Sequence, residues 1–269
     1  MPLAPQGTAS MTGLPGAGEH RRTTHPAPGG GLILAVAERR SMCGRTSLFV
    51  PKSELEDRFE ATVVAAGGYR PRYNIAPGSG LAVVTNEDTD AIDRFHWGLV
   101  PPWADAVDDG YINARAETAA ETRPFGDAWK HRPCLVLSSG FYEWKDVGAG
   151  PKEPHRVHRE DDPAFAMAGL WEETTVDDEP VRSVTILTTE PCDVLEPIHD
   201  RMPVVLCRDE ESAWLERGPA ERQTLCRPYP GDDLDAYPVG RTVNDPGNDD
   251  PRVIEPAETE QSGLGDFDG

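Results

Sequence analysis

The sequence predicts an α+β fold: a single β-rich domain with a curved, largely antiparallel, barrel-like sheet and flanking helices. Runs of β-branched and aromatic residues follow one another between clusters of Gly, Pro and Asp, which is typical of successive strands. The sequence lacks the regular alternation of strand and helix that would indicate a doubly wound parallel sheet. Hydrophobic residues make up 38% of the 269 residues, which is enough for a core.

The individual elements follow from these patterns. Helices are predicted over residues 51–60, with Ser53 as the cap, and over residues 209–217, with Asp209 as the cap and Gly218 as the stop. Residues 114–122 favour a helix by propensity. The predicted strands are residues 81–85, 93–98, 133–138, 141–145, 164–171, 181–188 and 203–207.

The composition changes twice along the chain, which divides it into three parts. Residues 1–41 hold four arginines and two glutamates among Gly, Pro, Thr and Ala, with no packing period, and predict a disordered leader. Residues 42–243 form the predicted domain. Residues 244–269 again combine acidic residues with Gly and Pro, and we expect a solvated, disordered acidic tail with no site in it.

The charge of the chain has two interpretations. The 47 acidic against 26 basic residues give a net charge of -21, which is typical of a protein that avoids nucleic acid or of one adapted to a cytoplasm near molar salt. We favour salt adaptation. Near molar salt the Debye length is only about 3 Å, so the repulsion between the acidic side chains is screened while they keep the surface hydrated. Five cysteines without a CxxC pair favour a reducing cytoplasm, and no apolar run approaches the roughly 18 residues of a membrane helix.

Cys43 directly follows Met42, and we expect Met42 to be the true start and residues 1–41 to be absent from the active protein. Removal of the methionine would leave Cys43 as a 1,2-aminothiol. Its α-amine, with a typical pKa of about 7.7 to 8.0, can attack an aldehyde, and its thiol can then close a thiazolidine ring. The alternative is a small, buried, structural cysteine.

Three further polar segments lie within apolar surroundings. Asn113 is a candidate to orient a carbonyl or hydroxyl group, and Arg115 is a candidate to bind a phosphate. The alternative is that Asn113 forms a turn at the end of a strand and Arg115 is an ordinary surface arginine. Glu143 lies among aromatic residues, where a carboxyl can transfer protons near neutral pH, although an exposed strand glutamate has the same pattern. His199 titrates near neutral pH and Asp200 or Arg201 can tune it, but a lone histidine is often structural.

Aromatic and basic residues also fit a groove for a single strand of nucleic acid. Stacking of bases on aromatic rings and contacts of phosphates with arginines are the usual interactions there, with core packing as the alternative for the tryptophans. The candidates are Trp97, Trp103 and Trp144 for bases, and Arg45, Arg72, Arg115 and Arg201 for phosphates.

Several ordered motifs resemble the SOS-response-associated peptidase (SRAP) family of abasic-site processing proteins. They are MCGR at residues 42–45, RYNIAPG at 72–78, WGLVPPW at 97–103, INARAET at 112–118, GFYEWK at 140–145 and IHDRMP at 198–203. The resemblance extends from residue 42 to about residue 244. It implies a β-rich α+β domain, in accord with the strands predicted above.

The resemblance implies recognition of abasic sites in single-stranded DNA and a covalent thiazolidine crosslink through an N-terminal cysteine, which shields the lesion. By position, Cys43 would be the nucleophile, Asn113 would hold the sugar, and Glu143 would be the acid/base. His199 would assist ring opening and crosslink reversal. Other matched positions would line the DNA path, with Trp103 as a stacking or wedge residue: Arg45, Asn74, Trp103 and Arg115.

The resemblance implies no metal or organic cofactor and no membrane partner, and we expect a monomer. Two features differ from the family: 41 residues precede Met42, and Ala104 follows Trp103 where some members have a second tryptophan. The family name also implies a peptidase. The alternative function is therefore a cysteine hydrolase that uses Cys43, His199 and Glu143, and a noncatalytic single-strand binder is a third.

Overall fold

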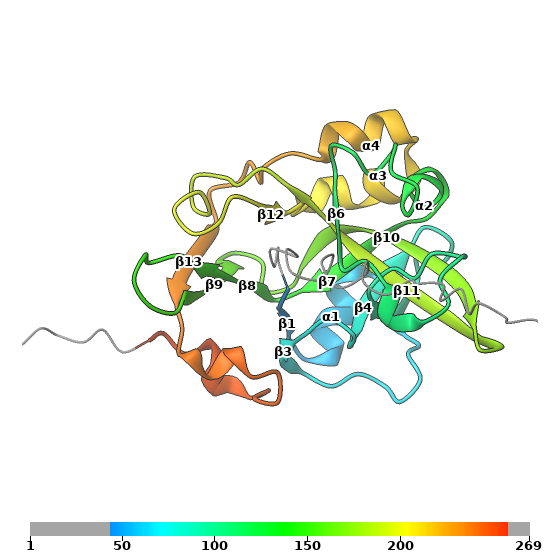
Figure 1. Cartoon of the computed structure of the whole chain (residues 1–269). Helices are drawn as coiled ribbons and strands as arrows, with labels where there is room; N and C mark the ends of the chain where they lie inside the picture. Colours follow the sequence, from blue (N-terminus) through cyan, green and yellow to red (C-terminus); the bar gives the residue numbers. More distant parts are fainter. Residues whose placement is uncertain (1–43, 258–269) are drawn as a thin grey trace, which may run out of the picture. The chain divides into compact units, whose positions relative to one another are not determined.

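The computed structural model describes residues 44–257 of the chain. These residues form a β-rich α+β domain in which most strand pairs are antiparallel, which confirms the predicted fold class (Figure 1). The predicted leader, Cys43 and residues 258–269 of the predicted tail lie outside the described residues.

The larger of two sheets closes on itself. Its strands are β2 (Thr62–Val63), β4 (Gly80–Thr85), β5 (Ala91–Trp97), β6 (Asn113–Arg115), β7 (Pro133–Ser138), β10 (Phe165–Val176), β11 (Glu179–Thr189) and β12 (Met202–Pro203). The order is β12-β11-β10-β7-β4-β5-β2, with β6 beside β11. Strand β11 also pairs with β5, in parallel, through Ser183 with His96 and Val184 with Trp97. Strands β11, β10, β7, β4 and β5 therefore form a closed ring, as the barrel-like prediction requires.

The smaller sheet is antiparallel and has the order β13-β9-β8-β1-β3. Its strands are β1 (Thr46–Leu48), β3 (Arg72–Ile75), β8 (Gly140–Lys145), β9 (Glu153–Arg159) and β13 (Leu234–Pro238). A single residue, Ser139, connects β7 of the larger sheet to β8. Gly140 has φ +149°, and a Cβ there would lie 2.7 Å from the carbonyl oxygen of Val157. The direct passage between the sheets therefore requires glycine at this position.

The hydrophobic core joins residues of the ring strands to residues outside the ring, such as Leu55 and Trp214, which lie in helices. Every residue of β7 is buried, because β7 lies between β4 and β10 in the closed sheet and also packs against the helix over residues 211–216. Trp97 on β5 is fully buried, and its indole N–H donates to the carbonyl oxygen of Ile112 at 2.9 Å. Trp97 is thus a core residue, and its assignment as a stacking candidate is wrong.

The helices are short. They are α1 (Lys52–Phe59), α2 (Gly126–His131), α3 (Glu211–Glu216) and α4 (Pro219–Leu225), with 3-10 turns η1 (Val107–Asp109), η2 (Arg208–Glu210), η3 (Arg241–Asn244) and η4 (Pro251–Ile254). Helix α1 confirms the prediction for residues 51–60, but Pro51 and not Ser53 is its N-cap residue. The helix predicted over residues 209–217 is divided into η2 and α3. Helices α2, α3 and α4 lie together at one end of the domain (Figure 1).

The helix predicted over residues 114–122 is wrong. Residues 113–115 instead pair in parallel with β11, from Ile186 to Thr188, and turns follow. A place in the sheet therefore overrides the helical propensity of Ala114 and its neighbours. The strand predicted over residues 203–207 is shorter, because the ladder with β11 ends at Pro203.

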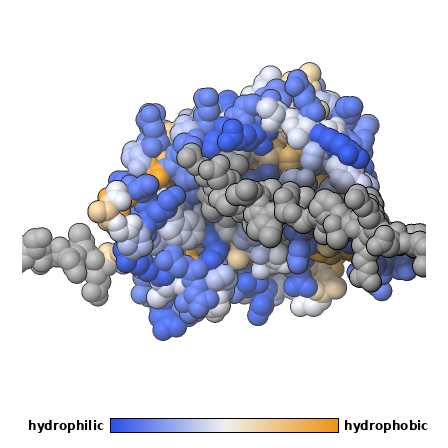
Figure 2. Space-filling model, viewed as in Figure 1, coloured by the Kyte–Doolittle hydropathy of each residue, from blue (hydrophilic) through white to orange (hydrophobic). Residues whose placement is uncertain are grey.

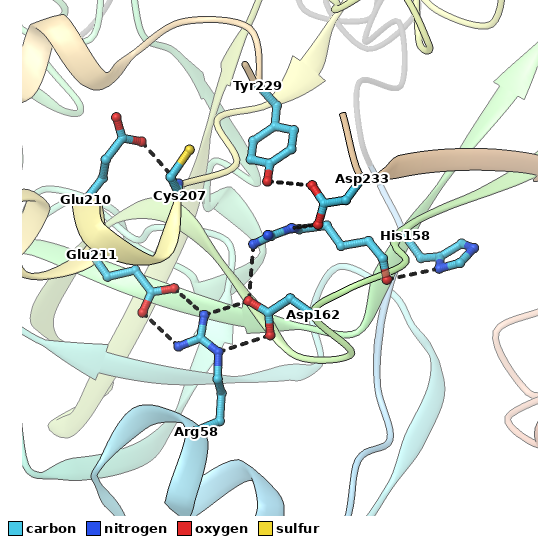
Figure 3. Close-up of polar contacts among 9 residues, drawn as sticks. Arg58, His158, Asp162, Cys207, Glu210, Glu211, Tyr229 and Asp233 are labelled. Carbon is cyan, nitrogen blue, oxygen red and sulfur yellow. Dashed lines mark hydrogen bonds and ion pairs between the residues drawn. The ribbon is translucent and has the colours of Figure 1, made fainter. Parts of the chain in front are cut away.

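A buried network of ion pairs connects elements that are distant in sequence (Figure 3). Arg58 on α1 donates to Asp162 at 2.8 and 3.0 Å and to Glu211 on α3 at 2.6 and 3.0 Å. Arg159 on β9 continues the network from Asp162 to Asp233. Burial alone would lower the pKa of Arg58, but hydrogen bonds to Glu211 and Asp162 raise it above its usual value.

The prediction of a disordered tail from residue 244 is wrong for residues 244–257. Val253 of η4 is 1% exposed and packs with Val243 and Tyr142 in a second apolar cluster. Asp249 accepts hydrogen bonds from the backbone of β3 and pairs with Arg72. Acidic residues in this segment therefore serve as specific acceptors, which composition alone does not reveal.

Candidate functional site

Glu143 lies on β8, close to the first described residue of the chain. Thr46 pairs with Phe141, and the N–H of Tyr142 donates to the carbonyl oxygen of Arg45 at 3.0 Å. This register leads the chain at Gly44 towards Glu143. The residues of β8 alternate as predicted, since Phe141 packs in the main core whereas Tyr142 belongs to the second cluster. Glu143 is 1% exposed, so the alternative of an exposed strand glutamate is wrong.

His199 faces Glu143 from a turn that precedes β12. Its Nε2 lies 3.9 Å from a carboxylate oxygen of Glu143. The side chain of Glu143 is buried and that of His199 is mostly so, with exposed fractions of 2% and 11%. Two candidate site residues that are 56 positions apart in the sequence thus lie side by side, while their roles as acid/base and as ring-opening residue stay predictions.

The opposite ring nitrogen of His199 has two neighbours. Nδ1 accepts a hydrogen bond from the backbone N–H of Arg201 at 3.1 Å. The Oδ1 atom of Asp200 lies 3.2 Å from the same nitrogen, but the Asp200 side chain is 79% exposed.

Asn113 and the turn of His199 flank the same end of β11. Asn113 pairs with Ile186 on one side of β11, and Met202 pairs with Thr189 on the other side. The side chain of Asn113 is half-buried. Strand β11 therefore positions both Asn113, the predicted sugar-holding residue, and the turn that carries His199.

A hollow of about 310 Å³ lies beside the start of the described chain, lined by Gly44, Arg45, Trp144 and Asn244. The guanidinium of Arg45 lies 6.0 Å from the centre of the Trp144 ring, and Asn244 accepts a hydrogen bond from the indole N–H at 2.8 Å. Partial burial lowers the pKa of Arg45, while the charge of Asp245 opposes this effect. The hollow thus offers a cation and an aromatic face next to Gly44.

Asn74 supports this hollow from within the protein. The side chain is fully buried, and its amide nitrogen donates to the carbonyl oxygens of Val243, Asp245 and Asn248 at 2.8 to 3.1 Å. Its oxygen accepts a hydrogen bond from Arg45 at 2.8 Å. Asn74 therefore positions Arg45 and the C-terminal segment, while a direct contact with DNA stays a prediction.

Trp103 lies on the surface with 44% of its area exposed. The guanidinium of Arg123 lies over its ring at 4.2 Å, a cation–π contact between residues 20 positions apart. Sequence reasoning missed Arg123, because no motif contains it. Arg115 is also exposed, so both predicted DNA contacts are accessible.

Two of the candidate phosphate ligands pair with carboxylates of the protein itself. Arg72 pairs with Asp249, and Arg201, which is 9% exposed, forms a two-pronged pair with Glu117 at 2.7 and 2.8 Å. Burial alone would raise the pKa of Glu117, but the hydrogen bonds and charge of Arg201 hold it below its usual value. These contacts contradict the assignment of Arg72 and Arg201 as free phosphate ligands.

Comparisons with known proteins show the family of the chain. The model of the family described as "SOS response associated peptidase (SRAP)" matches residues 42–246. The chain belongs to the SRAP family. The match includes the segments that carry Arg45, Asn113, Glu143 and His199.

Curated proteins that are similar in sequence to this chain are named abasic site processing proteins. The "Abasic site processing protein YoqW" of Bacillus subtilis is 38% identical over 80% of this chain and 99% of its own length. The "Abasic site processing protein YedK" of Escherichia coli is 29% identical over 69% of this chain and 84% of its own length. A crystal structure of a protein from Bacteroides thetaiotaomicron superposes with a TM-score of 0.73 and 26% identity, over 80% of this chain and all of the other.

Within residues 44–257, no group of three or more His, Cys, Asp or Glu side chains is arranged to hold a metal ion. In the same range, no helix is long and apolar enough to cross a membrane.

Proposed function

We propose that this SRAP protein binds single-stranded DNA at abasic sites and forms a covalent thiazolidine crosslink through Cys43. Its relatives are named for the processing of abasic sites. The observation that carries the proposal is the pair of Glu143 and His199, on a strand whose register with β1 leads towards Gly44, the residue after Cys43. Cys43 is joined to Gly44 by one peptide bond.

The chemistry requires a free amine and a thiol on one residue. Ring opening of the abasic sugar breaks the C1′–O4′ bond, moves a proton to O4′ and leaves an aldehyde. The amine of Cys43 adds to the aldehyde, water leaves, and an imine forms. The thiol then adds to the imine carbon and transfers its proton to nitrogen, so that the net products are a thiazolidine and one water molecule.

Each described site residue has a role in this scheme. Glu143 transfers protons in the addition and dehydration steps. His199 assists ring opening and reversal of the crosslink, and Asn113 holds the sugar. Arg45 and Arg115 contact the DNA backbone, and Trp103 stacks on a base.

Two forms of the protein test the proposal. One begins at Met42, so that removal of the methionine frees the amine of Cys43. The other keeps residues 1–41 and carries Met42→Ala, with the intact chain confirmed by mass spectrometry. We expect the first form to crosslink a single-stranded abasic oligonucleotide and the second to fail, because an amide nitrogen is delocalised into its carbonyl group. Equal crosslinking by both would contradict the mechanism.

Cys43→Ser separates the thiazolidine from a simple imine. Serine keeps the amine, so we expect an adduct that persists only after chemical reduction. Selective acetylation of the amine separates the cysteine hydrolase, because acyl transfer needs the thiol alone. A durable adduct with Cys43→Ser would exclude the thiazolidine.

A further inference from the structure

The hydrogen bond between the backbone of Arg201 and His199 has a consequence for the imidazole. A neutral imidazole carries one N–H, and the other ring nitrogen is an acceptor. Because Nδ1 accepts from the N–H of Arg201 at 3.1 Å, the hydrogen is at Nε2. Nε2 is the nitrogen that faces Glu143, at 3.9 Å.

Asp200 favours the opposite tautomer, since its carboxylate would accept a hydrogen from Nδ1 at 3.2 Å. Its side chain is 79% exposed, so water competes for the same oxygen. The backbone N–H of Arg201 cannot rotate away from Nδ1, because the Arg201 side chain is hydrogen-bonded and the next residue, Met202, is paired with β11. At Nδ1, the balance between these two neighbours therefore depends on how firmly Arg201 is fixed.

Arg201 is fixed by its side chain. The guanidinium donates to both carboxylate oxygens of Glu117, at 2.7 and 2.8 Å, and to the carbonyl oxygen of Thr188 at 2.6 Å. The next residue, Met202, enters the ladder with β11. The planar guanidinium group of arginine can donate two parallel hydrogen bonds to one carboxylate, which the ammonium group of lysine cannot do.

We propose that Glu117 and Arg201 are positioning residues for His199. Their ion pair holds the turn of residues 199–201, so that the peptide N–H of Arg201 keeps His199 in the Nε2–H tautomer that faces Glu143. The tautomer itself is independent of the reaction, whereas the kinetic consequence rests on the proposed function. The other tautomer would direct a lone pair towards the carboxylate of Glu143 and would remove the donor from the site.

The test combines a spectrum with a rate. Long-range ¹H–¹⁵N spectra of the protein that begins at Met42, recorded near pH 8, report which nitrogen of His199 is protonated, and His199→Gln assigns the signals. We expect Nε2–H in the wild type and a mixture of tautomers in Glu117→Gln. We also expect Glu117→Gln to slow crosslinking about tenfold, a part of what a general acid or base contributes.

The matched control is Glu172→Gln, which weakens another arginine–glutamate pair, with Arg132 at 2.7 Å, on β10. It should leave the tautomer and the rate as in the wild type. Nδ1–H in the wild type would overturn the inference without any variant, as would a slower Glu117→Gln that keeps the wild-type tautomer. A wild type that has the Nε2–H tautomer but forms no crosslink would instead contradict the proposed function.

Discussion

At the scale of single residues, the proposed proton transfer assigns Glu143 a role in a place where charge is poorly solvated. The residue is 1% exposed, and its carboxyl group has the imidazole of His199 as a close ionisable neighbour. A buried carboxyl with a titrating partner is suited to exchange protons and poorly suited to bind DNA phosphates, which it would repel. Glu143 should therefore affect the rate of reaction and not the affinity for DNA.

Glu143→Gln removes the proton carrier and keeps the volume of the side chain. We expect crosslinking to slow by about 10²- to 10⁴-fold, while equilibrium binding to undamaged single strands is nearly unchanged. Single-turnover crosslinking between pH 6 and 8 and a separate binding titration measure the two quantities. Glu153→Gln, on the adjacent strand with a side chain 47% exposed, is the control. A loss below about threefold for Glu143→Gln would assign it a structural role.

At the scale of elements, the C-terminal segment of residues 241–254 is held by side chains from the first third of the chain. Asn74 donates to three of its carbonyl oxygens, and Arg45 donates to the carbonyl oxygens of Val243 and Asn244. Because Asn244 lines the hollow beside Gly44, loosening of this segment should also disturb the candidate site.

Asn74→Ala leaves several buried carbonyl groups without their donor. We expect a loss of about 1–3 kcal/mol in the free energy of unfolding and faster amide exchange in residues 241–249. Hydrogen exchange with mass spectrometry measures both. Asn86→Ala, which removes a more exposed hydrogen bond to the carbonyl oxygen of His131, is the control. Unchanged exchange in residues 241–249 would show that Asn74 does not hold the segment.

The ion-pair network of Figure 3 makes a second prediction at this scale. Arg58→Met removes the arginine that pairs with the buried carboxylate of Glu211, and with it the ion pair that connects α1 to α3. We expect a loss of about 3–5 kcal/mol in the free energy of unfolding, measured by urea denaturation. Arg182→Met, at a pair whose arginine is 55% exposed, should cost less than about 1 kcal/mol. Equal losses would mean that burial of the network does not matter.

Local patterns predict most of the elements but few of the partners. Runs of β-branched and aromatic residues between clusters of Gly, Pro and Asp were sufficient to predict β4, β5, β7, β8, β10 and β11. Helical propensity was misleading at residues 114–122, where pairing with β11 decides the structure. The site motifs led to Glu143 and His199, whereas the pairs of Arg201 with Glu117 and of Arg123 with Trp103 join different segments and depend on the fold.

At the scale of the whole molecule, the charge limits how DNA can be held. The net charge is -21, and the visible face is mainly hydrophilic with small apolar patches (Figure 2). Arg72 and Arg201 are paired with carboxylates, which leaves Arg45 and Arg115 among the predicted phosphate ligands. Release of counterions from phosphates should therefore contribute little, and stacking and covalent capture should retain the strand.

Salt then separates the two stages of binding. Noncovalent affinity for a single strand should fall with a slope of about -0.7 per neutralised phosphate on a log–log plot, with few phosphates involved. The yield of the covalent adduct should persist as KCl rises to molar concentration. Gel assays of the adduct, with circular dichroism as a check of folding, measure this effect. A collapse of the yield in a folded protein would contradict adaptation to high salt.

The hollow beside Gly44 also sets the order of events during synthesis. Its walls come from both ends of the domain, since the guanidinium of Arg45 binds the carbonyl oxygen of Val243, 198 residues later. A ribosome makes the N-terminal part first, and contacts between such distant residues form late. Gly44 therefore leaves the ribosome long before Asn244 exists to complete the hollow. Under the proposed function, a nascent chain would contain Cys43 before the hollow exists, and crosslinking to DNA would begin only after residues 243 and 244 have been synthesised and folded.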